Sequence, residues 1–295
     1  MTMIFGVPLA VFMGQLTLGL VNGAFYALLS LGLAVIFGLL KIVNFAHGAQ
    51  YMLGAFAALL GFRYLGINYW LALVLVPVVV GGFGMLMERF LLRRIAHLDH
   101  LYGLLLTFGL ALIFEGTLVH FFGVSGARYA TPEILQGGLN LGFMFLPTYR
   151  AWVLVAALTM CLFTWFMIER TRLGAYLRAG TENSQLMQAF GVNVPLLITL
   201  TYGFGVGLAA FAGVLAAPLY PVSPTMGSSL LIVVFAVVVI GGMGSILGAI
   251  VTGLGMGVIE GLTKVYYPEA SNPVIFLVMI LVLMLRPAGL FGKEA

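Results

Sequence analysis

The polar residues that could contact a small solute are few, and one group interrupts two apolar stretches at residues 44–48 (Asn-Phe-Ala-His-Gly). Asn44 can cap the helix that follows, with the His47 amide as the donor. In one interpretation the segment only starts a helix, and Gly48 permits close packing. In the other, the segment lines a solute pathway, because unwound backbone in apolar surroundings survives only where protein buries it or a watery cavity adjoins it. Tyr51, one turn beyond His47 on the same face, suits packing better than contact but belongs to the same candidate pathway.

Two acidic residues lie inside other apolar stretches. Glu115 lies in the run 101–123 with no cation near it in sequence. A charge in such surroundings is costly, so Glu115 is a candidate either for lining the pathway or for bonding between helices. Glu260 stands four residues before Lys264, and this spacing predicts an ion pair on one helix face.

Patterns that bind metals or nucleotides are missing from the sequence. His97 and His100 flank Asp99, but three such residues are too few for a metal site and predict a solvated turn. The pattern G-x-x-x-x-G-K-[ST] does not occur, since the only Gly-Lys pair, Gly292-Lys293, is followed by glutamate. We therefore expect no metal, no cofactor bound by this chain and no catalytic residue, and the chain is not predicted to be an enzyme.

A polar segment spans residues 169–194, and its second half predicts a short helix over 181–191. Gly180 interrupts what precedes it, Thr181 is a good N-cap, and Glu182 in the first turn suits the positive end of the helix dipole. Gly191 can adopt the left-handed conformation that closes a helix. The spacing i, i+3 and i+4 places three apolar side chains on one face: Leu186, Met187 and Phe190. Such a helix either rests on lipid headgroups or contacts a soluble partner.

The elements that position these residues are membrane helices. Of the 295 residues, 62% are apolar and 7% charged, and the mean hydropathy is +1.16. Soluble domains carry about 25% charged residues, so a soluble fold is excluded. The net charge of +4 gives no basic face for nucleic acid. We predict an all-α polytopic membrane protein that forms one transmembrane domain over residues 1–295.

Apolar runs of about 20 residues predict eight or nine crossings, some broken or re-entrant. We expect the first to break around Gly19, Asn22 and Gly23, and one of the two short runs before residue 265 to be re-entrant. The candidate runs are 12–40, 48–65, 69–92, 101–123, 149–168, 195–218, 228–243, 245–265 and 272–286.

The cations predict the orientation. Alternate loops hold nine of the 13 Lys and Arg residues, and such loops are cytoplasmic by the positive-inside rule. The segment 169–194 and the C-terminus are then cytoplasmic. The cations on this side are Lys41, Arg89, Arg93, Arg94, Arg170, Arg172, Arg178, Arg286 and Lys293.

Six short stretches resemble the branched-chain amino acid permeases of ABC importers (LivH/LivM-type), most closely the LivH-type subunit. They occur in the family's order over nearly the whole chain. Residues 178–180 (Arg-Ala-Gly) and 189–193 resemble the family's coupling region, which adds Arg178 to the coupling residues. The other four stretches are 44–48, 208–215, 241–249 and 285–292.

The resemblance implies the ABC importer permease fold and a division of labour. A second, related permease completes the pore, two cytoplasmic ATPase subunits bind ATP and Mg²⁺, and a periplasmic or extracytoplasmic binding protein delivers the substrate. The expected function is the import of branched-chain or related small amino acids across the bacterial inner membrane, with coupling through 169–194. The alternative is a stand-alone secondary transporter or channel for a small polar solute such as urea, amides or carboxylates. Such a carrier usually keeps several buried charges, and this chain offers few.

Overall fold

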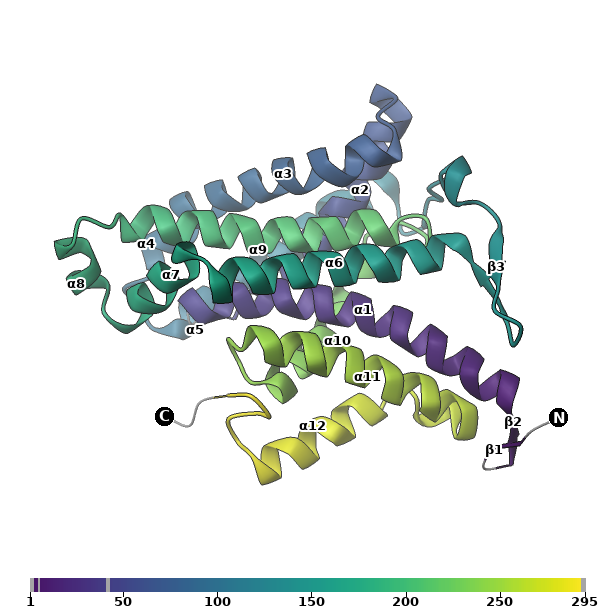
Figure 1. Cartoon of the computed structure of the whole chain (residues 1–295). Helices are drawn as coiled ribbons and strands as arrows, with labels where there is room; N and C mark the ends of the chain where they lie inside the picture. The colour runs from purple at the N-terminus through teal and green to yellow at the C-terminus, as the bar shows by residue number, and fades with distance from the viewer. Residues whose placement is uncertain (1–2, 5, 41–42, 293–295) are drawn as a thin grey trace. The chain divides into compact units, whose positions relative to one another are not determined.

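The computed structural model describes residues 3–4, 6–40 and 43–292. Lys41 and Lys293, two of the cations used for the orientation, lie outside the described residues. The short elements are β1 (Met3–Ile4), β2 (Val7–Pro8), β3 (Gly138–Asn140), β4 (Phe145–Pro147), the π-helix η1 (Glu88–Leu92) and the 3-10 helices η2 (Glu133–Leu135) and η3 (Pro268–Ala270). The helices are α1 (Leu9–Leu40), α2 (His47–Leu65), α3 (Tyr69–Met87), α4 (Arg93–Ile95), α5 (His100–Phe122), α6 (Thr148–Arg170), α7 (Arg172–Glu182), α8 (Ser184–Ala189), α9 (Val194–Ala216), α10 (Met226–Gly241), α11 (Ile246–Tyr266) and α12 (Val274–Leu285) (Figure 1).

A helix stands at every apolar range that the sequence predicted. Within the described residues, six helices are long and apolar enough to cross a membrane, namely α1, α3 with its continuation to Ile95, α5, α6, α9 and α11. The apolar helices α10 and α12 are shorter, with 16 and 12 residues. The chain is thus an all-α polytopic membrane protein, and the count of eight or nine crossings stays a prediction.

The helices pack into two compact units, and the first comprises Met1–Ser30, Thr131–Cys161 and Val233–Ala295. Here α1 runs unbroken through the glycines at which we expected a break, so that expectation was wrong. A Cβ atom on Gly19 would lie 2.6 Å from the Gly257 carbonyl oxygen, and one on Gly257 would lie 2.2 Å from the Gly23 Cα. The glycines let α1 and α11 approach closely, and this packing offsets their helix cost of about 1 kcal/mol each.

Two loops of this unit make regular backbone contacts. The turn-rich stretch before α6 contains the antiparallel hairpin β3–β4. The C-terminal segment after α12 returns to the end of α10, where the Leu290 amide donates to the Ile240 carbonyl at 2.8 Å. A Cβ on Gly289 would lie 2.5 Å from the Gly242 Cα. Two of the stretches that carry the family resemblance therefore pack against each other.

The second unit comprises Leu31–Ala130 and Leu162–Ile232, and α9 is its most buried long helix. Small residues let α9 approach α2 and α3, and α3 and α9 run side by side in Figure 1. A Cβ on Gly54 of α2 would lie 2.5 Å from the Ala210 Cα, and one on Gly81 of α3 would lie 2.8 Å from the Gly203 carbonyl oxygen. This packing brings α2, α3 and the start of α9 together around the polar residues described next.

Candidate functional site

A chain of buried side-chain hydrogen bonds starts at Asn44, in the link before α2. The Asn44 side chain accepts from the Ala46 amide at 3.1 Å and donates to Gln50 Oε1 at 3.1 Å. Gln50 Nε2 in turn donates to the Tyr202 hydroxyl oxygen on α9 at 3.2 Å. The expected cap was wrong in detail, because the His47 amide bonds to the main-chain oxygen of Asn44 and not to its side chain. Sequence reasoning missed Gln50 and Tyr202, although Gln50 is a polar residue one turn beyond His47.

The other residues of this candidate pathway are buried beside the same chain of bonds. His47 and Tyr51 are each 1% exposed. The His47 ring lies against Gly32 at the end of α1 that belongs to this unit. A Cβ on Gly48 would lie 2.4 Å from the Gly227 carbonyl oxygen, so this glycine permits a close helix contact. The structure brings Asn44, His47, Gly48 and Tyr51 together, and their role in a pathway stays a prediction.

Glu115 is not part of this network. It lies in α5, is half-buried, and makes no hydrogen bond or ion pair among the residues that the structure describes. Most of α5 is exposed, since Gly103 and Thr107 are its only fully buried described residues. Pathway lining and bonding between helices both stay open for Glu115.

The segment proposed to contact a partner forms two helices, not one. α7 continues through Gly180 to Glu182, and Asn183 caps α8 by accepting from the Leu186 amide at 2.9 Å. The predicted N-cap at Thr181 was therefore wrong, and Thr181 and Glu182 stand in the last turn of α7. The helix runs past Gly180, and the break falls where Asn183 is extended, with a φ of −149°.

The end of α8 follows the prediction more closely. Gly191 has a φ of 82°, the left-handed conformation expected of a residue that closes a helix. Phe190 is 76% exposed and Leu186 is 54% exposed, whereas Met187 is half-buried. Arg178 on α7 is exposed, and its guanidinium donates to the Ile168 carbonyl at 2.9 Å and pairs with Glu169 at 3.4 Å. The apolar pair of Leu186, on α8, and Phe190, directly after it, is thus exposed.

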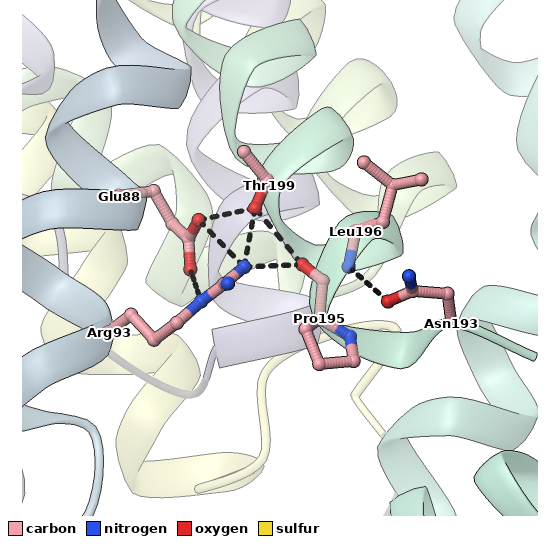
Figure 2. Close-up of polar contacts among 6 residues, drawn as sticks. All are labelled: Glu88, Arg93, Asn193, Pro195, Leu196 and Thr199. Carbon is pink, nitrogen blue, oxygen red and sulfur yellow. Dashed lines mark hydrogen bonds and ion pairs between the residues drawn. The ribbon is translucent and has the colours of Figure 1, made fainter.

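A second polar cluster joins the end of α3 to the first two turns of α9 (Figure 2). The Glu88 carboxylate is 2% exposed and accepts from the Thr199 hydroxyl at 2.5 Å. Arg93 Nε lies 3.4 Å from the same carboxylate, and Arg93 Nη2 donates to the Pro195 carbonyl and to Thr199 Oγ1, each at 2.7 Å. Asn193 caps α9 by accepting from the Leu196 amide at 3.1 Å. The sequence pointed to Arg93 only as a cytoplasmic cation, and the signal that could have found Glu88 is an acid in an apolar run five residues before an arginine.

The acidic residues Glu260 and Asp99 also have partners in the structure. The predicted Glu260–Lys264 ion pair is confirmed, and Tyr26 OH on α1 also donates to Glu260 at 2.7 Å. Asp99 caps α5 by accepting from the Leu101 amide at 2.9 Å. No group of three or more His, Cys, Asp or Glu residues that could hold a metal occurs among the described residues.

Comparisons with known proteins agree on one family. The family described as "Branched-chain amino acid transport system / permease component" matches residues 15–283. The high-affinity branched-chain amino acid transport system permease proteins LivH of Escherichia coli and BraD of Pseudomonas aeruginosa are 29% and 30% identical, and each match covers 96% of both chains. LivM of Escherichia coli is 27% identical over 90% of this chain and 67% of its own length. No solved structure gives a significant match.

The family match extends over α1 to α12 and includes the buried network at Asn44 and the segment around α8. The chain therefore belongs to the branched-chain amino acid ABC permease family and is of the LivH type, as its short sequence stretches predicted.

Proposed function

We propose that this protein is one permease subunit of an ABC importer that carries branched-chain or related small amino acids across the inner membrane. ATP hydrolysis in partner subunits drives it, and residues 1–295 act as one transmembrane domain. The observation that carries the proposal is the exposed apolar pair on α8, at the end of a short link to the buried helix α9. In a chain of this family, such a surface suits contact with a soluble ATPase.

The link between α8 and α9 is short and internally bonded, as force transmission requires. Only Phe190, Gly191, Val192 and Asn193 separate the two helices. The Val192 amide donates to the Met187 carbonyl at 3.1 Å, and the Gly191 amide donates to the Gln188 carbonyl at 2.9 Å. The Asn193 side chain caps the first turn of α9. A displacement of α8 would therefore move the start of α9 by a similar amount, because the bonded link between them would deform little.

The buried chain Asn44–Gln50–Tyr202 is the proposed lining of the substrate pathway, together with His47. These groups supply hydrogen-bond donors and acceptors among apolar helices, which suits a zwitterionic solute that must not bind tightly. Alternating access requires packed elements that can adopt two arrangements. The glycine contacts of α9 with α2 and α3 give close packing without long interlocking side chains, and we propose that the movement occurs there.

The proposed partners are a second related permease, two cytoplasmic ATPase subunits and an extracytoplasmic binding protein. LivM and LivH are both described as permease proteins of a high-affinity branched-chain amino acid transport system, and this supports pairing with a LivM-like chain. ATP and Mg²⁺ would bind to the ATPases. We propose that the coupling segment and the C-terminus face the cytoplasm.

Reconstitution into liposomes tests the proposal. The complete assembly should accumulate labelled leucine only when ATP is enclosed with the ATPase subunits and the binding protein is supplied on the other side. Liposomes with this chain alone should neither hydrolyse ATP nor accumulate leucine. Accumulation by this chain alone, driven by an ion gradient, would replace the proposal with a secondary carrier.

A further inference from the structure

The Glu88 carboxylate is a charged group that neither the predicted pathway nor the contact with the ATPase uses. It is 2% exposed, although it follows directly after the apolar helix α3. A buried carboxylate is retained only where charged or hydrogen-bonding partners compensate its lost hydration. Its partners here are Arg93, five residues further on, and Thr199, which is 111 residues away in sequence.

A local change of helix type brings Glu88 and Arg93 onto one face. Residues five apart lie on different faces of an α-helix, because about 3.6 residues make one turn. Residues Glu88–Leu92 form a π-helical turn, and the Arg93 amide donates to the Glu88 carbonyl. This wider turn lets the Arg93 side chain fold back over the Glu88 carboxylate. Such turns often mark functional positions inside α-helices.

The same guanidinium also holds the first two turns of α9. Arg93 Nη2 donates to the Pro195 carbonyl at 2.7 Å and to Thr199 Oγ1 at 2.7 Å, and the Thr199 hydroxyl gives its hydrogen to Glu88 at 2.5 Å (Figure 2). One carboxylate, one guanidinium and one hydroxyl therefore tie the end of α3 to the start of α9. Charge-assisted bonds of this kind are the stronger and more directional ones.

The cluster lies where the segment that contacts the ATPase would enter the membrane domain. Pro195 follows the link 190–193 by two residues, and Asn193 caps the same helix turn. Further along, α3 and α9 pack closely through Gly81 and Gly203. The charge-assisted bonds of Glu88, Arg93 and Thr199 lie at the end that leads to α8.

We propose that Glu88, Arg93 and Thr199 are positioning residues that clamp the first two turns of α9 to α3, so that movement of α8 shifts both helices together. This inference rests on the proposed function, in which α8 receives the movement of an ATPase. Without the clamp, α8 would still bind the ATPase, but the first two turns of α9 would move without α3. ATP would then be hydrolysed with less substrate moved.

The test compares two threonines on the same helix in the reconstituted assembly. Thr199→Val removes the clamp hydroxyl at nearly constant volume. Thr201→Val is the matched control, because the Thr201 hydroxyl donates to the Leu197 carbonyl of the same helix at 2.9 Å and makes no bond to α3 among the described residues. The measured quantity is the number of ATP molecules hydrolysed per leucine imported. We expect Thr199→Val to raise this ratio about fivefold or more, the lower end of ordinary coupling between sites. Thr201→Val should leave it unchanged.

Two further variants separate positioning from folding. Thr199→Ser keeps the hydroxyl and should restore the wild-type ratio. Arg93→Lys keeps the charge but loses the planar fork that reaches several acceptors at once, so it should raise the ratio as well. If Thr199→Val does not reach the membrane, Arg93→Lys carries the test with the same expected rise. Co-purification of the ATPases should stay at the wild-type level in each variant.

The outcomes distinguish this inference from the proposed function. An unchanged ratio in Thr199→Val and Arg93→Lys, or an equal rise in Thr201→Val, would overturn the clamp while wild-type uptake still depends on ATP. Loss of the ATPases from Thr199→Val would also overturn it, since the residue would then serve binding and not transmission. Wild-type uptake that does not depend on ATP would refute the proposed function, and the clamp with it.

Discussion

Replacing Phe190 by alanine tests whether α8 is the surface that binds the ATPase. Phe190 is 76% exposed in this chain, so its removal should change the stability of the permease by no more than about 0.5 kcal/mol, as at other surface sites. The substitution should instead weaken the binding of the ATPase, because the Phe190 ring would be buried in that complex. The substitution therefore separates docking from folding.

The magnitude follows from the surface that docking can bury. Complete burial of a Phe side chain contributes roughly 1.5–3 kcal/mol, so burying the 76% that is now exposed contributes about 1.1–2.3 kcal/mol. At about 1.4 kcal/mol per factor of ten, Phe190→Ala should weaken the ATPase complex about 6- to 40-fold.

The assay is titration of detergent-solubilised permease with labelled ATPase subunits, read by fluorescence anisotropy. Tyr64→Ala is the matched control, because Tyr64 is 72% exposed but lies at the far end of α2. The Tyr64→Ala permease should bind the ATPase subunits with the same affinity as the wild type. If Phe190→Ala binds the ATPase as tightly as the wild type while both proteins are folded, α8 is an ordinary interfacial helix and the coupling assignment fails.

Three further predictions concern packing, the pathway and the loop between α5 and α6. Gly257→Ala should prevent stable folding because its Cβ would lie 2.2 Å from the backbone of α1, whereas Gly255→Ala on the same helix has open space and should fold normally, as thermal unfolding in detergent would show. His47→Leu and Tyr202→Phe should each lower leucine uptake at matched abundance and unchanged ATPase binding; normal uptake by both would assign these residues to packing alone. Burial, with nearby Tyr69 adding to it, raises the pKa of Tyr129 to about 12. In the unfolded chain the Tyr129 hydroxyl ionises near pH 10, whereas in the folded protein it stays neutral up to about pH 12. The stability that this residue contributes is therefore fully present below pH 10 and is lost between pH 10 and about 12. Tyr129→Phe should abolish that part of the loss in unfolding midpoints measured from pH 9 to 12, and an unchanged pH dependence would contradict the burial argument.

The sequence by itself determined the class of the protein and the places of its apolar helices. A chain with 7% charged residues cannot cover a soluble surface, and apolar runs of membrane length can satisfy their backbone only as helices. Interactions within one or two helical turns could also be predicted from the sequence. The Glu260–Lys264 pair and the helix end at Gly191 were predicted correctly, because helical periodicity and glycine's tolerance of positive φ are local properties.

The tertiary structure decided which polar residues meet. Gln50 and Tyr202 are 152 residues apart, and Glu88 and Thr199 are 111 apart, so no spacing in the sequence relates them. Their bonds exist because small residues let α9 lie close to α2 and α3. The same effect overturned the expected break in α1, since glycine predicts a break in an isolated helix but a close contact in a packed one. The chain's propensities fix where helices can form, whereas the packing of helices on one another fixes which side chains are buried together and must therefore be paired.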